Sequence, residues 1–210
     1  MEILAHRGSW DKPENKNSLS SLEKAFLKNY GIETDIRDYK GRLVISHNIA
    51  DEESVDLETF LQWYHDNNCT QTLALNVKAD GIQTLLAELL EKYCITNYFL
   101  FDMSVPEAVV NRSRNLNYYT RHSDIEPHCV LYDDACGVWL DSFFDFGWIG
   151  ADIIKKHLED GKEVCLVSPE LHGRDKAELW NMIKYSMYVD TSRLKLCTDC
   201  PDDAKVFFNE

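Results

Sequence analysis

The chain has 210 residues, of which 44% are hydrophobic and 28% charged, an ordinary composition for a globular protein. Its net charge is −14, from 22 basic and 36 acidic residues. This charge excludes a typical nucleic-acid-binding protein, because contact with a phosphate backbone needs a basic surface. It also argues against electrostatic docking on anionic lipid.

No apolar run approaches the roughly 18 residues that a membrane helix needs. The opening residues MEILAHRG lack the basic and long apolar regions of a secretory signal. The seven cysteines are odd in number and scattered, which favours free, buried thiols in a reducing compartment. The single CxxC motif, Cys197 to Cys200, has no second motif to complete a zinc site. We therefore expect a cytoplasmic protein without membrane insertion.

Short apolar strands alternate with amphipathic helical stretches along the whole chain. Strands are expected at residues 2–8, 31–39, 42–48, 72–78, 97–103, 116–123, 137–143, 163–171 and 193–199. Helices are expected at residues 18–29, 57–67, 82–93, 106–115, 149–159 and 176–188. A repeating strand–helix order predicts parallel strands joined by crossover helices.

The strands at 31–39 and 42–48 are separated only by Lys40-Gly41, which predicts a tight hairpin. With the second of these strands counted as an excursion, eight strand units remain, the number that closes a (β/α)8 TIM barrel. The connection at 124–136 contains Pro127 and predicts a weak or absent helix. No linker or repeat divides the chain, so we expect one α/β domain over residues 1–210, with a doubly wound open sheet as the alternative.

Ionisable side chains gather where the predicted strands end. In a barrel, functional groups lie at the C-terminal ends of the strands. The residues at these ends are His6, Arg7, Glu33, Asp35, His47, Asn76, Lys78, Asp102, Arg121, His122, Asp141, Glu170, His172 and Asp199. This density exceeds what packing requires and predicts a functional site at the strand ends.

Glu33 and Asp35 are the most informative pair. Residues two apart on a strand point to the same face, so both carboxylates converge on one volume. Two ionised acids so close repel each other unless a cation lies between them. A hard divalent cation with oxygen ligands, Mg²⁺ or Ca²⁺, would resolve this repulsion. The alternative is a solvated edge strand whose acids face water.

His6 and His47 end the strands that flank this acid pair. Imidazoles titrate near neutral pH and can act as general base and general acid on either side of a reacting phosphorus. Arg7 and Lys78 carry the cations that would bind phosphate oxygens. The alternative for each histidine is a hydrogen-bonded core residue.

The stretch LAHRGSWDKPENKNSLSSLEKAFLKNYGIETDIRDYKGRLVISHN resembles the opening of the glycerophosphodiester phosphodiesterases. The matching elements, in order, are His6-Arg7-Gly8, Pro13-Glu14-Asn15, Ala25-Phe26, Glu33-Thr34-Asp35, Lys40-Gly41 and His47. Thr198-Asp199 followed by Pro201 is similar to the end of the family's last strand. The middle of the chain shares only the β/α rhythm.

The resemblance implies a TIM-barrel phosphodiesterase that uses one divalent metal ion. It implies His6 and His47 as the paired catalytic histidines, Glu33 and Asp35 as metal ligands, and Arg7 as a phosphate contact. The family's reaction is a metal-assisted attack on the phosphodiester, often by a neighbouring substrate hydroxyl. That attack gives a cyclic phosphate, which water then opens.

The chain departs from the family pattern on its third main strand. The family has Glu-x-Lys there, and this chain has Asn76-Val-Lys78. An amide oxygen can still coordinate Mg²⁺ or Ca²⁺, although it brings no charge. A carboxylate from another strand end, Asp102, Asp141 or Glu170, is the candidate for compensation.

Two further residues are assigned to the predicted site. Glu14, on the loop after the first strand, is expected to support the site or to orient Arg7. Arg121, in YYTRHSDIEP, is expected to contact substrate, with a structural role at the barrel rim as the alternative. Tryptophans 139, 148 and 180 are expected to pack in the core.

The leading hypothesis is a metal-dependent phosphodiesterase acting on a small glycerophosphodiester. One alternative is a lyase that stops at the cyclic phosphate. Another is a degenerate barrel that binds a phosphorylated ligand without turnover, which the change to Asn76 motivates. No sequence pattern identifies the alcohol on the phosphodiester, the choice between Mg²⁺ and Ca²⁺, or the oligomeric state.

Overall fold

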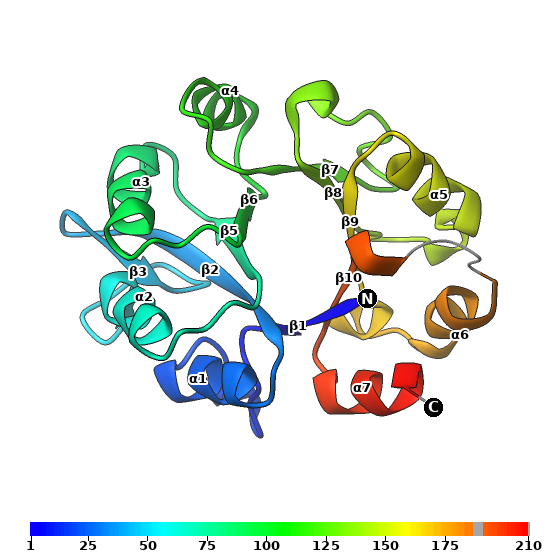
Figure 1. Ribbon diagram of the computed structural model, residues 1–210, viewed down its shortest axis with the longest axis horizontal. Helices are drawn as coiled ribbons and strands as arrows, with labels where there is room; N and C mark the ends of the chain where they lie inside the picture. The colour runs from blue at the N-terminus through cyan, green and yellow to red at the C-terminus, as the bar shows by residue number, and fades with distance from the viewer. Residues whose placement is uncertain (187–190, 210) are drawn as a thin grey trace. The chain divides into compact units, whose positions relative to one another are not determined.

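The structure is a computed structural model that describes residues 1–186 and 191–209 (Figure 1). It comprises two compact units: the N-terminal unit, Ala5–Tyr118, and the C-terminal unit, Met1–Leu4 with the chain from Tyr119 onward. The strands are β1 (Glu2–His6), β2 (Gly31–Tyr39), β3 (Arg42–Ile45), β4 (Val55–Asp56), β5 (Leu73–Val77), β6 (Tyr98–Phe101), β7 (Tyr119–His122), β8 (Gly137–Leu140), β9 (Glu163–Val167) and β10 (Leu194–Thr198). The helices are α1 (Leu19–Leu27), α2 (Leu57–Asp66), α3 (Gln83–Lys92), α4 (Val105–Ser113), α5 (Ala151–Glu159), α6 (Ala177–Ser186) and α7 (Pro201–Asn209).

In the N-terminal unit, β2, β5 and β6 pair in parallel, and β1 lies beside β2. The register places Asp35 opposite Asn76. β3 pairs with β2 in antiparallel fashion, and β4 pairs with β3. The link between β2 and β3 turns tightly because Lys40 and Gly41 both have positive φ angles, 49° and 81°, as a two-residue hairpin turn requires.

Helices α1 and α2 cover this part of the sheet, α1 against β2 and α2 against β3 (Figure 1). Each begins at a side-chain cap: Ser18 accepts a hydrogen bond from the Ser21 amide, and Asp56 caps α2 in the same way. Phe26 of α1 packs against Phe60 and Tyr64 of α2, with ring centroids 6.1 and 5.2 Å apart. These contacts join α1 to α2.

In the C-terminal unit, β7, β8, β9 and β10 pair in parallel, each with the next strand along the chain. A doubly wound sheet needs a reversal of strand order, and the described strands of neither unit show one. The doubly wound alternative is therefore wrong for both units.

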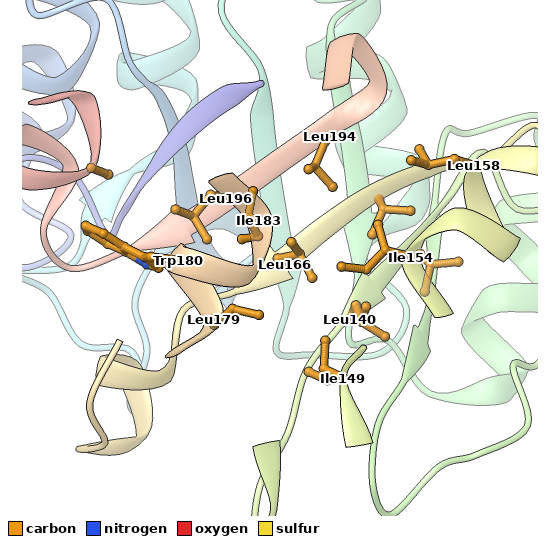
Figure 2. Close-up of a cluster of buried hydrophobic side chains, with 13 residues drawn as sticks. Leu140, Ile149, Ile154, Leu158, Leu166, Leu179, Trp180, Ile183, Leu194 and Leu196 are labelled. Atoms are coloured by element: carbon orange, nitrogen blue, oxygen red, sulfur yellow. The ribbon is translucent and has the colours of Figure 1, made fainter. Parts of the chain in front are cut away.

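The core of this unit lies between β8, β9 and β10 and helices α5 and α6. Figure 2 shows its cluster of buried apolar side chains, including Leu140, Ile154, Leu166 and Trp180. Each fully buried aliphatic side chain contributes roughly 1.5–3 kcal/mol. Trp180 is 3% exposed, and the expected packing role of the tryptophans is confirmed for it. Trp139 is also buried, and Trp148 packs against the cluster.

Each predicted strand and helix is present, mostly with shorter ends. The last two residues of the helix expected at 176–188 lie outside the described residues. Segment 124–136 contains only a 3₁₀ turn at Tyr132–Asp134, as Pro127 indicated. The predictions missed β4 and α7.

The expectation of buried thiols is wrong for Cys94 and Cys136, which are exposed, whereas Cys165 and Cys197 are buried. Cys94 follows the end of α3 in a left-handed turn, with φ 53°, where the chain lies at the surface. A search of the described residues finds no helix that is long and apolar enough to cross a membrane.

Candidate active site

The first corner of the site is a tight turn at the end of β1. Arg7 and Gly8 both have positive φ angles, 56° and 90°, which end the strand. Only glycine fits at position 8, because a Cβ there would lie 2.6 Å from the carbonyl carbon of Ser21. The turn places the Arg7 amide against β2, where it donates to the carbonyl oxygen of Glu33 at 2.8 Å.

The acid pair of β2 is buried, with Glu33 1% and Asp35 0% exposed. This excludes the solvated edge strand. His6 Nε2 lies 3.7 Å from Glu33 Oε2. Asp35 has two cationic neighbours: Arg7 Nε at 2.9 Å from Oδ2 and Lys78 Nζ at 3.4 Å from Oδ1. The structure therefore brings five of the predicted site residues together at the ends of β1, β2 and β5.

Asn17 is a member of this cluster that the sequence interpretation missed. Its Nδ2 donates to Asp35 Oδ2 at 2.9 Å, and its Oδ1 accepts from Thr34 at 2.8 Å. The backbone N–H of Asn17 donates to the carbonyl oxygen of Arg7 at 2.9 Å. Asn15, which the family motif singled out, is exposed. Asn17 directly precedes Ser18, the N-cap of α1, and that capping pattern is the signal that places residue 17 beside the strand end.

Asn76 lies between two carboxylates. Its Nδ2 is 3.4 Å from Glu33 Oε1 and 3.3 Å from Asp102 Oδ2. Asp102 ends β6 in a left-handed conformation with φ 61°, which costs of order 1 kcal/mol for a residue with a side chain. Of the carboxylates proposed to compensate for Asn76, Asp102 is the one with a contact to it.

The pKa of Glu33 is raised to about 8, because burial disfavours the charged carboxylate and Asp35 adds a second negative charge. Arg7, Lys78 and the hydrogen bond from Asn76 act in the opposite direction but do not cancel these effects. At pH 7 the carboxyl is therefore mostly protonated when only the chain's own cations surround it.

Three buried oxygens of the cluster accept no hydrogen bond: Glu33 Oε2, Asp35 Oδ1 and Asn76 Oδ1. An orphaned buried acceptor costs about 1–3 kcal/mol. Carboxylate and amide oxygens are the ligands that Mg²⁺ and Ca²⁺ prefer. No group of three or more His, Cys, Asp or Glu side chains suited to a metal occurs among the described residues, so the third oxygen here comes from an amide. With that amide included, the donor set fits a hard divalent cation.

His47 lies in a groove of about 520 Å³ in the same unit. Arg7 and Glu14 also line this groove, so Arg7 belongs to both the groove and the buried cluster. His47 is exposed, and its Nδ1 lies 3.1 Å from Asn48 Oδ1. An amide oxygen only accepts, so Nδ1 carries a hydrogen, and Nε2 is the nitrogen that can exchange a proton.

Arg121, Asp141 and Glu170 belong to the C-terminal unit. Arg121 pairs with Glu126 and stacks over Phe143, with 5.5 Å from its guanidinium carbon to the ring centroid. Asp141 accepts from His172 Nε2 at 2.8 Å. Glu170 accepts hydrogen bonds from Ser168 and Thr198. Each of these side chains therefore has a partner inside its own unit.

No protein-family model matches the sequence, and no curated protein matches it. Solved structures do match over the full chain. A protein from Galdieria sulphuraria, assigned as a glycerophosphodiester phosphodiesterase, aligns with a TM-score of 0.79 and 16% identity over 100% of this chain and 98% of its own. A glycerophosphodiester phosphodiesterase from Agrobacterium tumefaciens aligns with a TM-score of 0.68 and 15% identity, covering 99% and 98%.

A phosphodiesterase from Oleispira antarctica, solved in complex with the product sn-glycerol-3-phosphate, aligns with a TM-score of 0.73 and 13% identity. The alignment covers 100% of this chain and 97% of that one. Identities this low carry information about fold, and the predicted α/β fold class agrees with them. The chain therefore has the fold of the glycerophosphodiester phosphodiesterases.

Proposed function

We propose that the chain is a metal-dependent phosphodiesterase that hydrolyses a small glycerophosphodiester. The observation that carries the proposal is the cluster at the ends of β1, β2 and β5. There, two buried carboxylates meet a histidine and two cations, and three buried oxygens accept no hydrogen bond. The fold agrees with this activity, and the Oleispira relative holds a phosphate monoester of glycerol.

Arg7 and Lys78 are the phosphate-binding groups of the proposal. Both are partly exposed, with 20% and 23% of their side chains accessible, whereas their partner Asp35 is fully buried. Each can therefore keep its ionic contact with Asp35 while it donates hydrogen bonds to a phosphate oxygen. Asn17 donates to the same carboxylate oxygen, Asp35 Oδ2, that Arg7 contacts, and so helps to hold the Asp35 side chain in place.

The two histidines move protons. His47 has its lone pair on Nε2 and accepts the proton of the attacking hydroxyl or water. His6, next to Glu33, gives a proton to the leaving alcohol oxygen. Glu14 lines the groove beside Arg7 and supports the site there.

The residues that would hold a divalent cation are Glu33, Asp35 and Asn76. When bound, Mg²⁺ or Ca²⁺ would neutralise charge on the phosphodiester and polarise its P–O bonds. The contribution of the chain is to keep the three oxygens buried on adjacent strands, where none of them accepts a hydrogen bond. Two of them also have ionic neighbours, Lys78 beside Asp35 Oδ1 and His6 beside Glu33 Oε2. Arg121 is proposed as a substrate contact on the grounds of its place at the end of β7.

The test is an assay of the metal-stripped chain on a panel of glycerophosphodiesters, with Mg²⁺ or Ca²⁺ added back and the products followed by ³¹P NMR. We expect cation-dependent turnover to glycerol phosphate, a terminal monoester. A persistent cyclic ester would instead identify a lyase. Tight binding of phosphate esters without turnover on any substrate would contradict the proposal and favour a binding protein.

A further inference from the structure

Asp102 is a carboxylate of the N-terminal unit that contacts the candidate cation site and has no role in the proposed function so far. It directly follows β6, which pairs in parallel with β5 and places Phe101 opposite Asn76. Asn76 Nδ2 lies 3.3 Å from Asp102 Oδ2 and 3.4 Å from Glu33 Oε1. The amide of Asn76 therefore lies between carboxyl groups from the two strands that flank β5.

The donors and acceptors of these groups determine which way the amide of Asn76 points. Nδ2 carries two hydrogens, and a carboxyl oxygen from each neighbouring strand lies within hydrogen-bond reach of it. If the amide were turned over, its oxygen would face Asp102 Oδ2, and an ionised carboxylate has no hydrogen to donate. Asp102 therefore favours the orientation in which Asn76 Nδ2 points towards the end of β6.

The same orientation leaves the oxygen of the amide without a hydrogen bond inside the protein. Asn76 is 7% exposed, and its Oδ1 accepts no hydrogen bond. A buried acceptor without a partner costs about 1–3 kcal/mol, so the contacts at Nδ2 have to favour this orientation. The oxygen of an asparagine coordinates Mg²⁺ or Ca²⁺, and its NH₂ group does not. The orientation that Asp102 favours is therefore the one that suits a cation.

Asp102 is suited to this place by its backbone and by its exposure. Its φ of 61° lies in the left-handed region, which aspartate and asparagine adopt more readily than most residues. Asp102 is partly exposed, whereas Asn76 is buried. A carboxylate that keeps contact with water avoids much of the desolvation cost of a third buried acid beside Glu33 and Asp35. Asp102 can therefore accept from Asn76 without being buried in the site.

We propose that Asp102 is a positioning residue of the cation site: it accepts a hydrogen bond from Asn76 Nδ2 and thereby presents Asn76 Oδ1 to Mg²⁺ or Ca²⁺. The inference rests on the proposed function in one respect, that Glu33, Asp35 and Asn76 bind the cation. Asp102 acts through Asn76 and is not itself a ligand. In agreement with this role, the described residues contain no group of three acidic, His or Cys side chains suited to a metal, so Asp102 does not complete one with Glu33 and Asp35.

The hydrogen bond is tested by NMR on the ¹⁵N-labelled, cation-free chain, in which the side-chain amide signals of Asn76 are identified by their absence from Asn76→Glu. We expect Asp102→Gly to shift one of the two Nδ2 hydrogen signals upfield, because that hydrogen loses its acceptor. Glycine accepts the φ of 61° without strain, so the variant should keep the fold. Asn68→Gly, at an exposed left-handed position of the same unit, should leave the Asn76 signals unchanged. Asn76 signals that do not respond to Asp102→Gly would overturn the hydrogen bond.

The effect on the cation is measured by calorimetric titration with Mg²⁺ or Ca²⁺. Loss of a group that orients a metal ligand typically weakens metal binding 10–100-fold, and we expect about tenfold for Asp102→Gly. Asp102→Asn keeps an acceptor oxygen for Asn76 Nδ2 and should recover part of this loss. Asn68→Gly should bind as the wild type does. Equal losses in Asp102→Gly and Asp102→Asn would mean that Asp102 acts through its charge alone, which would overturn the positioning role.

A second background shows whether Asp102 acts through Asn76. Asn76→Glu has no NH₂ group for Asp102 to hold, so adding Asp102→Gly to it should not weaken cation binding further. A similar loss in both backgrounds would show an effect independent of Asn76 and would overturn the inference. Equal binding by the wild type and Asp102→Gly would overturn the inference alone. Absence of cation binding by the wild type would overturn the metal dependence of the proposed function together with it.

Discussion

The two units differ in whether their buried polar side-chain atoms are hydrogen-bonded. Among the described residues, every buried side-chain nitrogen or oxygen without a hydrogen bond lies in the N-terminal unit; these atoms belong to Arg7, Glu33, Asp35, Asn76, Gln83, Glu107 and Asn111. Of these, Arg7 Nε and Asp35 Oδ1 take part in ion pairs. In the C-terminal unit, buried polar side chains such as His157 and Thr198 have partners. The contacts that link His122, His157, Tyr132 and Asp160 are an example of this pairing.

The difference indicates which unit is prepared for a ligand. Each orphaned atom costs about 1–3 kcal/mol, so a cluster of them persists only where something else is gained. At the strand ends, Arg7 Nε and Asp35 Oδ1 are compensated by ion pairs, whereas Asn76 Oδ1 and Glu33 Oε2 are buried acceptors without a hydrogen bond. Other buried atoms without a hydrogen bond lie on α3 and α4, outside the candidate site, and have no functional explanation. They belong to Gln83, Glu107 and Asn111.

The largest expected effect is on catalysis. His6→Ala and His47→Ala should each lower kcat about 10²–10⁴-fold, because each removes one proton-transfer step. The matched control is His65→Ala, at an exposed histidine on α2 of the same unit, which should leave kcat unchanged. Steady-state kinetics on the best substrate of the panel measures kcat for the three variants and the wild type. Equal activity of His6→Ala and His65→Ala would remove the strand-end cluster from the chemistry.

Loss of a cation from the cluster should be the largest stability effect. Arg7→Met leaves the buried Asp35 with one fewer positive neighbour and should lower the free energy of unfolding by about 2–4 kcal/mol. Lys24→Met breaks the exposed pair with Asp11 and should cost less than about 1 kcal/mol. Urea titrations of both variants compare the two pairs. Similar losses would mean that the Arg7–Asp35 contact behaves as a surface ion pair.

Replacement of Asn17 should cause the next largest loss of stability. Asn17→Ala loses two buried hydrogen bonds and places alanine at φ 62°, for a cost of about 2–3 kcal/mol. Asn15→Ala, two residues earlier and exposed, should change stability by less than about 0.5 kcal/mol. Thermal unfolding of the two variants distinguishes them. A larger loss from Asn15→Ala would restore the motif assignment made from the sequence.

The smallest of these effects concerns the amide of β5. Asn76→Glu supplies a third carboxylate and should tighten binding of Mg²⁺ or Ca²⁺ about tenfold, which is about 1.4 kcal/mol. The same change should lower stability without the cation, since it adds a charge beside Glu33 and Asp102. Asn67→Glu, exposed at the end of α2, is the control for added charge. Calorimetric titration in which the two variants bind equally would count against Asn76 as a ligand.

Much of the fold was predictable because its signals are local. The bounds of β2 match the prediction at both ends, since Lys40-Gly41 fixes where the strand must turn. β4 was missed because it has only two residues and depends on its pairing with β3. α7 was missed because it follows the last strand directly, with Pro201 as its first residue.

The sequence predicted which residues form the site better than it predicted the contacts between them. The strand-end rule selected His6, Arg7, Glu33, Asp35 and Lys78, which the structure brings together. It could not select Asn17, because that contact depends on the left-handed turns at Arg7 and Asn17. It also could not predict the raised pKa of Glu33, which follows from burial and from the balance of its neighbours.

If the buried carboxylates of β2 bind a divalent cation, proton release on binding tests this most directly. Because the pKa of Glu33 is raised to about 8, the carboxyl is mostly protonated at pH 7 and must lose its proton to bind a cation. Titration calorimetry with Mg²⁺ or Ca²⁺, in two buffers of different ionisation enthalpy, counts the protons released.

We predict about one proton released at pH 7, close to none at pH 10, and none at either pH in Glu33→Gln. The Glu33→Gln variant should also bind the cation more weakly. Binding at pH 7 without proton release, release that persists in Glu33→Gln, or no binding of either cation would contradict the account.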